Sequence, residues 1–371
     1  MLSPRCIALL GRKDEPTDAI EEYCRYLGSA LQAHDFQLEV RRVPWELHGW
    51  RDALRVLKLQ AQQWDGRCVL VQYTALAWSA RGFPQRVLRV LKILKSAGTC
   101  VGIVFHDMEP YPGSRLVDFL RRTIQIRTMS HALSLTDFAV FTVPPEKISW
   151  LAVVPSNAAF IPVGPNLPIS SLPLTGSSRQ ENVYTIGVFS ITGGKQGVRE
   201  TEVILGAVRH TSQKLGKLRL SVFGRHSELR EADLRAGLKG LPVELLVEGV
   251  AEPEQIVEKL SACDVLLFVR GGISSRRGSA IAGIACGLPL IAFSGPETAP
   301  PISEAGVVLI PPDQPDQLNA ALARVLSDPE CRNDLAARSR AAYQAHFAWP
   351  AIAARFAAIL NRQSVLFSRS E

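Results

Sequence analysis

The feature that most constrains this sequence is an alternation of short apolar runs with amphipathic stretches, which occurs once in each half of the chain. Short apolar runs predict buried strands, and apolar residues at helical spacing predict the helices between them. The strands expected in the first half are Cys6–Leu10, Gln37–Val43, Val69–Tyr73, Val101–Phe105 and Phe138–Val143. This alternation predicts a parallel sheet with right-handed crossovers and helices on both faces.

A change of composition separates the two halves. Four prolines lie within residues 162–174, and the polar run Thr175–Asn182 follows, which is typical of a linker. The alternation then restarts, with strands expected at Tyr184–Phe189, Leu218–Phe223, Val243–Glu248, Val265–Val269, Pro289–Ala292 and Val307–Ile310. Because 371 residues exceed the size of most single cores, we expect an α/β protein of two Rossmann-like, doubly wound domains joined near residue 175.

Composition and charge narrow the possible partners. An apolar content of 47% with 21% charged residues is typical of a globular enzyme and excludes a mostly disordered chain. A net charge of +7 fits nucleic acid, anionic lipid or a phosphorylated ligand. No RNP-like, zinc-binding or helix-turn-helix pattern accompanies this charge, so we expect no nucleic acid partner.

Cysteine usage and hydropathy indicate the compartment. The seven cysteines include no C-x-x-C pair and no metal-ligand spacing, which favours reduced, buried thiols. No signal peptide is recognisable, and every apolar run falls short of the ~20 residues that span a bilayer. We therefore expect a cytoplasmic protein, either soluble or peripheral on the inner face of a membrane.

The chemistry is expected where the parallel strands end. In doubly wound sheets, ligands bind at the carboxyl ends of the strands, among loops and helix N-termini. Two such sheets facing one another would form a cleft with two substrate sides. The loops that follow Phe105, Phe189, Phe223 and Val269 are therefore the candidates for the site.

Several segments resemble those of one enzyme family. The stretch 262–268 (ACDVLLF) runs through a Gly/Arg/Ser loop into 285–292 (ACGLPLIA), and this resembles the carboxyl-terminal domain of family 4 (group 1) glycosyltransferases. The resemblance extends over nearly the whole chain through 248–250, 306–311 and 346–349, and through 71–73, 105–107 and 161–166 in the first half. It implies a GT-B fold, with an acceptor domain at 1–174, a donor domain at 175–345 and a terminal helix at 346–371 that crosses back to the acceptor domain.

The resemblance fails at one important place. The family's donor site usually carries two glutamates with seven residues between them, the second lying three positions before the Ala of the A-x-G-x-P turn. Counting back from Ala285 places these positions at Ser274 and Ala282, and neither is acidic. The chain is therefore expected to be a variant that either holds its donor differently or has lost transferase activity.

The turn that contains the first of these positions has features of an anion site. Its residues are Ser274, Ser275, Arg276, Arg277, Gly278 and Ser279. They link a buried strand to a helix N-terminus, where free amides and the helix dipole favour an anion, and arginine adds a bidentate phosphate donor. We expect this turn to be the main anchor of the donor diphosphate. The alternative is a solvated basic turn in which a serine caps the helix.

A second anion candidate follows the strand that ends at Phe189. By the family pattern, this glycine-containing loop carries a Lys or Arg for the donor diphosphate. The residues expected to bind the donor there are Gly193, Gly194, Lys195 and Arg199. The loop lacks the Walker spacing and the terminal Lys-Ser/Thr pair, so it is not a P-loop. Arg225, which follows the next strand, adds another positive charge or is an ordinary surface residue.

His106 and Asp107 close the strand Val101–Phe105. A histidine or a carboxylate at this edge can take the proton of an acceptor hydroxyl, so these two are the expected catalytic residues. The alternatives are a helix-capping Asp and a His that bonds to backbone. No Asp-x-Asp triplet occurs, which suits a GT-B enzyme that stabilises the leaving diphosphate with cations and helix dipoles, so we expect neither metal nor cofactor.

The helix expected at 83–97 is basic and amphipathic. It spaces Arg86, Arg89, Lys92 and Lys95 three residues apart. Such a helix can rest on an anionic membrane, or it can simply expose a solvated face.

The function expected from all of these features is transfer of a sugar from a nucleotide sugar to a carbohydrate or lipid-linked acceptor, in polysaccharide or glycoconjugate biosynthesis. The alternatives are a catalytically inactive GT-B homologue that serves as a binding or assembly subunit, and a nucleotide-sugar epimerase.

Overall fold

The computed structural model describes residues 5–111, 113–169 and 183–367, which form two compact units. Unit 1 comprises residues 1–162 and 349–371, and unit 2 comprises residues 163–348. The boundary expected at 174/175 lies in the stretch 170–182, outside the described residues. The chain leaves unit 1 after Pro162 and returns to it at Trp349.

Unit 1 contains a six-stranded parallel sheet in the order β2-β1-β3-β4-β5-β6. The strands are β1 (Arg5–Leu10), β2 (Gln37–Arg42), β3 (Cys68–Tyr73), β4 (Cys100–Phe105), β5 (Phe138–Phe141) and β6 (Ala158–Phe160). Ile7 of β1 is in register with Glu39 of β2 on one side and with Val69 of β3 on the other. The short edge strand β6 had not been expected from the sequence.

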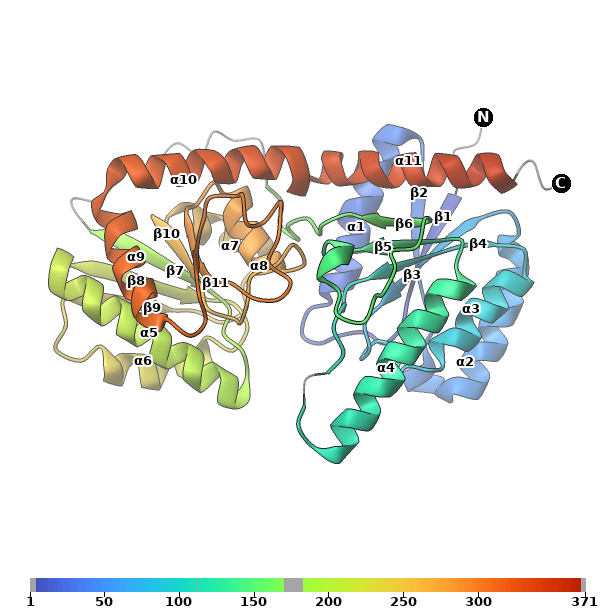
Figure 1. The fold of residues 1–371 in the computed structure, drawn as a ribbon, viewed down its shortest axis with the longest axis horizontal. Coiled ribbons are helices and arrows are strands. Elements are labelled where there is room, and N and C mark those ends of the chain that lie inside the picture. Colours follow the sequence, from blue (N-terminus) through green and yellow to red (C-terminus); the bar gives the residue numbers. More distant parts are fainter. Residues whose placement is uncertain (1–4, 112, 170–182, 368–371) are drawn as a thin grey trace. The chain divides into compact units, whose positions relative to one another are not determined.

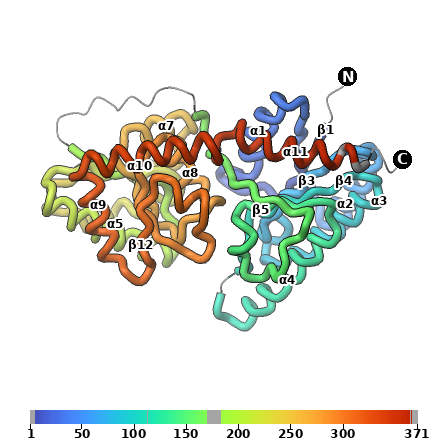
Figure 2. Tube along the Cα trace, turned by 45° about the horizontal axis from the view of Figure 1, so that its top comes forward, coloured from blue at the N-terminus to red at the C-terminus, as the bar shows by residue number. Residues whose placement is uncertain are grey.

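The helices of unit 1 follow from the strand order. They are α1 (Ala19–Leu31), α2 (Trp45–Ala61), α3 (Val87–Ser96), α4 (Leu116–Leu135) and α11 (Trp349–Phe367), with 3₁₀ turns at Gln32–His34, Gln62–Trp64 and Pro145–Lys147. The β1-to-β2 crossover runs opposite to the later ones, so right-handed crossovers place α1 on one face and α2, α3 and α4 on the other. Helix α11 lies beside α1 (Figures 1 and 2).

Two features of unit 1 differ from the sequence-based expectation. Residues 45–50, for which no helix was expected, belong to α2, which is kinked at Gly49 (φ 72°). The terminal helical segment, expected from residue 346, enters unit 1 at Trp349. Residues Tyr343–Phe347 instead form a π-helical turn that extends α10 (Pro329–Ala342) of unit 2, whereas Trp349 stacks on Tyr26 of α1 with ring centroids 5.7 Å apart.

Unit 2 contains a second six-stranded parallel sheet in the order β12-β11-β10-β7-β8-β9. The strands are β7 (Tyr184–Phe189), β8 (Leu218–Phe223), β9 (Val243–Val247), β10 (Val265–Phe268), β11 (Leu290–Phe293) and β12 (Val307–Ile310). Its helices are α5 (Gly194–Leu215), α6 (Glu231–Gly237), α7 (Pro253–Ser261), α8 (Gly278–Ala285), α9 (Pro315–Ser327) and α10 (Pro329–Ala342), with a 3₁₀ turn at Glu228–Arg230.

Each sheet has its own hydrophobic core. Fully buried apolar side chains of β1, β3, β4 and β5 pack with α2 and α3 in unit 1, and those of β7, β8 and β10 pack with α5 and α9 in unit 2. The prediction of two doubly wound α/β domains is confirmed. The strand order reverses between β1 and β3 in unit 1 and between β7 and β10 in unit 2, and such switch points are where ligands bind in these sheets.

None of the helices in the described ranges is long and apolar enough to cross a membrane.

Candidate functional site

The switch point of unit 2 is shaped by glycines at the start of α5. The helix begins at Gly194, so part of the segment expected to be a glycine-containing loop after Phe189 forms its first turn. A Cβ on Gly197 would lie 2.0 Å from the carbonyl oxygen of Thr192, so only glycine lets the helix approach the end of β7 this closely. The N-terminal amides of α5 are therefore held at the carboxyl edge of the sheet, where they favour an anion.

Two of the predicted cations lie on this helix. Lys195 is in the first turn of α5 and Arg199 is one turn further on, and both are exposed. Gly193 is the N-cap residue, and Gly194 has a φ of 65° that suits glycine. An exposed Lys near a helix N-terminus adds a mobile positive charge to the field of the amides.

Near this turn lies a group of charged residues, of which only Arg225 was predicted from the sequence. Arg225 follows β8, and its backbone N donates to Ser190 Oγ at 3.2 Å. Glu200 is buried in α5, where Oε2 accepts from Thr192 N at 2.7 Å. Arg270 follows β10. Burial lowers the pKa of Arg270, as does the charge of Arg225, whereas the carboxylate of Glu200 raises it.

This arrangement leaves unfilled hydrogen-bonding capacity at the switch point. Neither Glu200 Oε1 nor Arg270 Nε has a hydrogen-bond partner among the described residues, although both atoms are buried. Burying a guanidinium nitrogen without a hydrogen-bond acceptor destabilises the folded protein, unless a ligand or a water molecule accepts that hydrogen bond. Arg270 could have been found from the sequence, because it is the first charged residue after a buried strand. Glu200 gave no such signal.

The turn after β10 is organised by a carboxylate from a distant part of the chain. Glu297, in the loop after β11, accepts from Ser274 Oγ at 3.0 Å and from Arg276 Nε at 2.8 Å, both through Oε2. Glu297 is only 8% exposed, and its Oε1 has no hydrogen-bond partner within the described ranges. Sequence reasoning missed this residue.

Two glycines allow Glu297 to reach the turn. A Cβ on Gly272 would lie 2.7 Å from the Cα of Gly295, and a Cβ on Gly295 would lie 2.9 Å from the Cα of Gly272. The two loops therefore touch backbone to backbone, and Ile273 N donates to the carbonyl oxygen of Phe293 at 2.9 Å. This contact brings the loop after β11 against the loop after β10.

The remaining predicted residues of this turn lead into α8. Ser275 is fully buried, and its hydroxyl has no partner among the residues described. Arg277 is the N-cap residue of α8, and Gly278 and Ser279 form its first turn. Since Arg276 is ion-paired with Glu297, part of the positive charge expected to hold a diphosphate is already neutralised within the protein.

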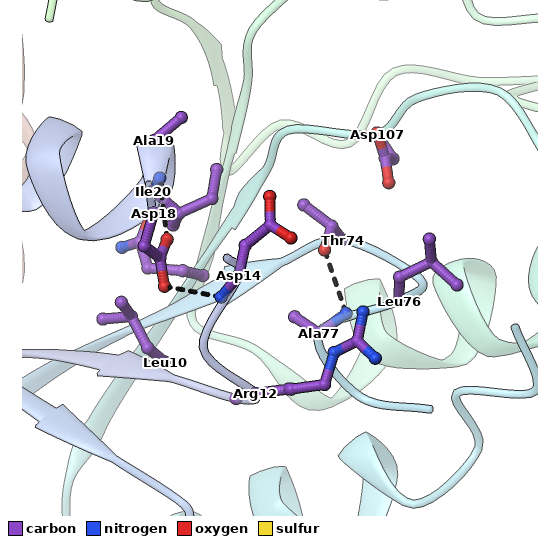
Figure 3. Close-up of a pocket in the computed structure, with 12 residues that line it drawn as sticks. Leu10, Arg12, Asp14, Asp18, Ala19, Ile20, Thr74, Leu76, Ala77 and Asp107 are labelled. Carbon is purple, nitrogen blue, oxygen red and sulfur yellow. Dashed lines mark hydrogen bonds between the residues drawn. The ribbon is translucent and has the colours of Figure 1, made fainter. Parts of the chain in front are cut away.

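The switch point of unit 1 carries a pocket of about 280 Å³ (Figure 3). It is lined by the segments that follow β1 and β3 and by Asp107 after β4. Asp14, Asp18 and Asp107 contribute carboxylates, Thr74 contributes a hydroxyl, and Arg12 is the basic residue of the lining. The pocket therefore suits a ligand rich in hydroxyl groups, because carboxylates accept hydrogen bonds from them.

One carboxylate of this pocket has a structural role. Asp18 caps α1 through Oδ1, which accepts from the backbone N of Ile20 and of Glu21, and its Oδ2 accepts from Arg42 at 2.8 Å. Burial raises the pKa of Asp18, but these hydrogen bonds together outweigh burial and keep it below its ordinary value. The hydrogen bond from Arg42 also lowers the pKa of Glu21.

The two predicted catalytic residues have different surroundings. Asp107 is half-buried and lines the pocket, where Oδ2 accepts from Ala75 N at 3.3 Å. His106 is buried under the ring of Tyr23, at a centroid distance of 4.9 Å, and its Nε2 lies 2.8 Å from Gln72 Oε1. Because Gln72 Nε2 donates to Leu70 O, Gln72 Oε1 is an acceptor and His106 Nε2 carries the proton.

Metal-ligating side chains do not converge in the described part of the chain. No group of three or more His, Cys, Asp or Glu residues there is arranged to hold a metal ion.

Comparison with protein families finds a match that lies within unit 2. Residues 197–342 match the family model described as glycosyl transferases group 1. This match covers Arg199, Arg225 and the whole 274–279 turn, and it excludes Gly193, Gly194 and Lys195. No curated protein sequence matches the chain.

Solved structures extend the similarity to both units. Sucrose-phosphate synthase from Thermosynechococcus elongatus is 19% identical with a TM-score of 0.71, and the match covers 99% of this chain and 100% of that one. A glycosyltransferase from Rickettsia africae (12%, TM-score 0.66, 98% and 99% covered) and α,α-trehalose 6-phosphate synthase from Burkholderia multivorans (13%, TM-score 0.62, 100% and 98% covered) also match. At these identities the likeness is one of fold, and the predicted GT-B fold is confirmed.

Proposed function

We propose that this chain is a glycosyltransferase that moves a sugar from a nucleotide-diphosphate donor to a carbohydrate or lipid-linked acceptor, in polysaccharide or glycoconjugate biosynthesis. One observation carries the proposal. The switch point of unit 2 gathers the N-terminus of α5, Arg225 and the half-buried Arg270, and the two arginines lie in the region that matches the group 1 glycosyltransferase model. Because these amides and arginines are already in position before the donor binds, they can stabilise the charge of a diphosphate leaving group.

In this proposal the diphosphate is bound mainly at the start of α5. Gly193, Gly194 and Lys195 provide backbone amides and a mobile ammonium, while Arg225 and Arg270 provide fixed charge from the neighbouring strand ends. Arg199 adds charge one turn further along the helix. As the bond between the sugar and the diphosphate breaks, negative charge grows on the leaving oxygen, and these cations stabilise it without a metal ion.

In this proposal the 274–279 turn is not the main anchor of the donor diphosphate, which is the role expected of it from the sequence. Arg276 is paired with Glu297, so the turn presents a carboxylate as well as Arg277, Gly278 and Ser279 to the donor. Ser274 stands where the family resemblance expects the first glutamate, and its hydroxyl donates to Glu297. Glu297 thus supplies from another loop the carboxylate that position 274 lacks, and its Oε1 accepts a hydrogen bond from a donor hydroxyl.

The acceptor is proposed to bind in the pocket of unit 1. Asp107 accepts the proton of the attacking hydroxyl, and His106 acts as a positioning residue that fixes Gln72 in the pocket wall. The names of two structural neighbours mention phosphorylated sugars. Asp18 is paired with Arg42, but Asp14 and Asp107 still place two carboxylates in a lining whose one basic residue is Arg12, so an unphosphorylated acceptor is favoured here.

A thermal-shift screen against UDP-, GDP-, ADP- and dTDP-sugars tests the donor part, since a ligand that binds only the folded state raises its stability. The best donor is then incubated with candidate acceptors, each offered as a free sugar and as its phosphate. Release of nucleoside diphosphate together with a product of the expected mass supports the proposal. Arg270→Met removes a donor-site charge, and Arg219→Met, on an exposed ion pair with Glu244 in the same unit, is the matched control.

The screen also separates the proposed function from the inactive-homologue alternative, which the serine at 274 and the alanine at 282 favour. Donor binding with no turnover against any acceptor would support a binding subunit. Absence of binding to every nucleotide sugar would contradict both readings of the unit 2 site.

A further inference from the structure

The N-terminal half of α4, residues 116–125, inverts the usual arrangement of a surface helix. Their inward side is polar: Asp118 is buried, accepts from Arg115 N at 3.1 Å and pairs with Arg121. Gln125 is also buried, and its Nε2 donates to Gly82 O at 2.9 Å while its Oε1 accepts from Tyr111 N at 2.8 Å. Arg121 Nε also donates to Arg81 O at 3.0 Å, so hydrogen bonds from Gln125 and Arg121, and not apolar packing, hold this end of the helix to unit 1.

The outward side of the same turns is apolar. Leu116 is 90% exposed, Phe119 61%, Leu120 56% and Val117 44%. Single exposed apolar residues are common, but four within five consecutive positions form a patch, and such patches mark surfaces that contact a partner or a membrane. We call these four residues the α4 patch.

The position of the patch suits contact with an extended surface. In Figures 1 and 2 the N-terminal end of α4 reaches beyond the other helices of unit 1. Residues at such an end can enter a flat partner without displacing the rest of the domain. The patch is also separate from the pocket of unit 1, since none of its residues lines that pocket.

The charge around the α4 patch identifies the partner. Residues 115–135 contain Arg115, Arg121, Arg122 and Arg127, and their one acidic residue is the buried Asp118. Arg115, Arg122 and Arg127 are exposed. Apolar side chains flanked by arginines are the combination that anionic lipid attracts. A second copy of the chain would place these arginines against one another and is disfavoured.

The helix expected to contact a membrane, at 83–97, is arranged differently. Its apolar residues Val87, Val90, Leu91 and Leu94 are completely buried in the core, so these side chains are not available to enter a lipid surface. Lys95 is paired with Asp137 at 2.7 Å. The basic residues of α3 form the solvent-exposed face of a helix that packs on the core. Membrane contact through α3 stays a prediction, and no feature of this helix favours it.

We propose that the α4 patch docks unit 1 on an anionic lipid surface, with Leu116, Val117, Phe119 and Leu120 entering the headgroup region and Arg115 and Arg122 contacting lipid phosphates. This inference does not depend on the proposed function, because none of the patch residues lines the pocket. It requires no spanning segment, since an interfacial helix binds by burying one apolar side.

Sedimentation with vesicles tests the proposal. The full chain is spun with vesicles of pure phosphatidylcholine and with vesicles that contain one third phosphatidylglycerol. We expect binding to the anionic vesicles that weakens as salt rises, and little binding to the neutral ones.

Two double variants test the contributions of the apolar and the basic residues separately. Leu116→Ser with Phe119→Ser should reduce the partition coefficient at least about ten-fold, since two apolar side chains no longer enter the lipid. Arg115→Gln with Arg122→Gln should abolish the salt dependence.

Matched controls distinguish docking from general surface effects. Leu47→Ser removes an apolar side chain that is 80% exposed on α2, and Lys92→Gln removes a charge from the basic stripe of α3, so neither should change binding. Because every substituted side chain is exposed, circular dichroism and thermal midpoints should match the wild type. The proposal is overturned if wild-type protein ignores anionic vesicles, if the serine variant binds as well as wild type, if the controls lose binding equally, or if light scattering shows that the patch makes a dimer instead.

Discussion

Replacing Glu297 by glutamine tests whether this buried carboxylate contacts the donor or only supports the 274–279 turn. The side chain keeps its shape, so an acceptor oxygen remains for Ser274 Oγ, at 3.0 Å, and for Arg276 Nε, at 2.8 Å. What disappears is the negative charge. Burying a neutral amide is cheaper than burying a carboxylate, and this offsets the weaker bond to Arg276. We therefore expect the free energy of unfolding to change by less than about 1 kcal/mol.

The effect on donor binding should be larger and have a definite sign. A hydroxyl hydrogen bond to a carboxylate contributes about 1.5–3 kcal/mol, against about 0.5–1.5 kcal/mol for a neutral acceptor. The difference of roughly 1.4 kcal/mol corresponds to about a ten-fold increase in the Kd of the nucleotide sugar. If Glu297 touched no ligand, the opposite would follow: Arg276 would lose its counter-charge and attract a diphosphate more strongly.

Isothermal titration of the best nucleotide sugar from the screen measures this sign directly. Urea denaturation of the same samples reports whether the variant is as stable as expected. Glu248→Gln is the matched control, because Glu248 is an exposed carboxylate of unit 2 that pairs with Lys259 at 2.5 Å. Tighter binding by Glu297→Gln would refute the donor contact proposed for Glu297, and an unchanged Kd would also count against it.

Three further changes test other parts of the structure. Asp107→Asn should lower kcat at least about a hundred-fold with little effect on donor affinity, because a carboxamide cannot take the hydroxyl proton; full activity would exclude Asp107 as the base. Arg42→Met should destabilise the protein most near neutral pH and progressively less below about pH 4 in urea titrations. The reason is that Arg42 depresses the folded-state pKa of Asp18 and Glu21, so stability present above their unfolded pKa is lost as pH falls; a pH-independent loss would contradict this coupling. Gly197→Ala should cost about 3 kcal/mol or more, because the new Cβ meets backbone at 2.0 Å, whereas Gly206→Ala on the same helix meets nothing within 4 Å and should be neutral or slightly stabilising by denaturation.

Most of the fold was predictable because its signals are local. Strands β7, β8 and β12 have the predicted bounds, since β12 is a contiguous apolar run and the apolar residues of β7 and β8 are interrupted only by single small or polar residues. The edge strand β6 was missed because three half-buried residues carry no periodicity. The first turn of α5 was missed because glycines normally disfavour helix, and here the close approach at Gly197 outweighs that preference.

The candidate site was less predictable because it depends on contacts between distant loops. Strand-end reasoning led to His106 and Asp107 together, yet only tertiary packing decides that one lines the pocket and the other lies under Tyr23. Glu297 reaches Ser274 because two glycines in separate loops touch, and no pattern within either loop predicts that contact. Similarly, the exposed side of α4 could not be known until polar residues were seen to face inward.

The return of the chain to unit 1 at Trp349 has a consequence for biosynthesis. Unit 2 is one continuous segment, so a ribosome finishes all of it before the last helix of unit 1 is made. Until then, Tyr23 and Tyr26 of α1 lack the indole that later packs against them at 5.3 and 5.7 Å. The domain synthesised first is therefore the last to be completed. A stop codon just before residue 349 would remove no residue of unit 2, yet it would leave an apolar surface of α1 uncovered on unit 1.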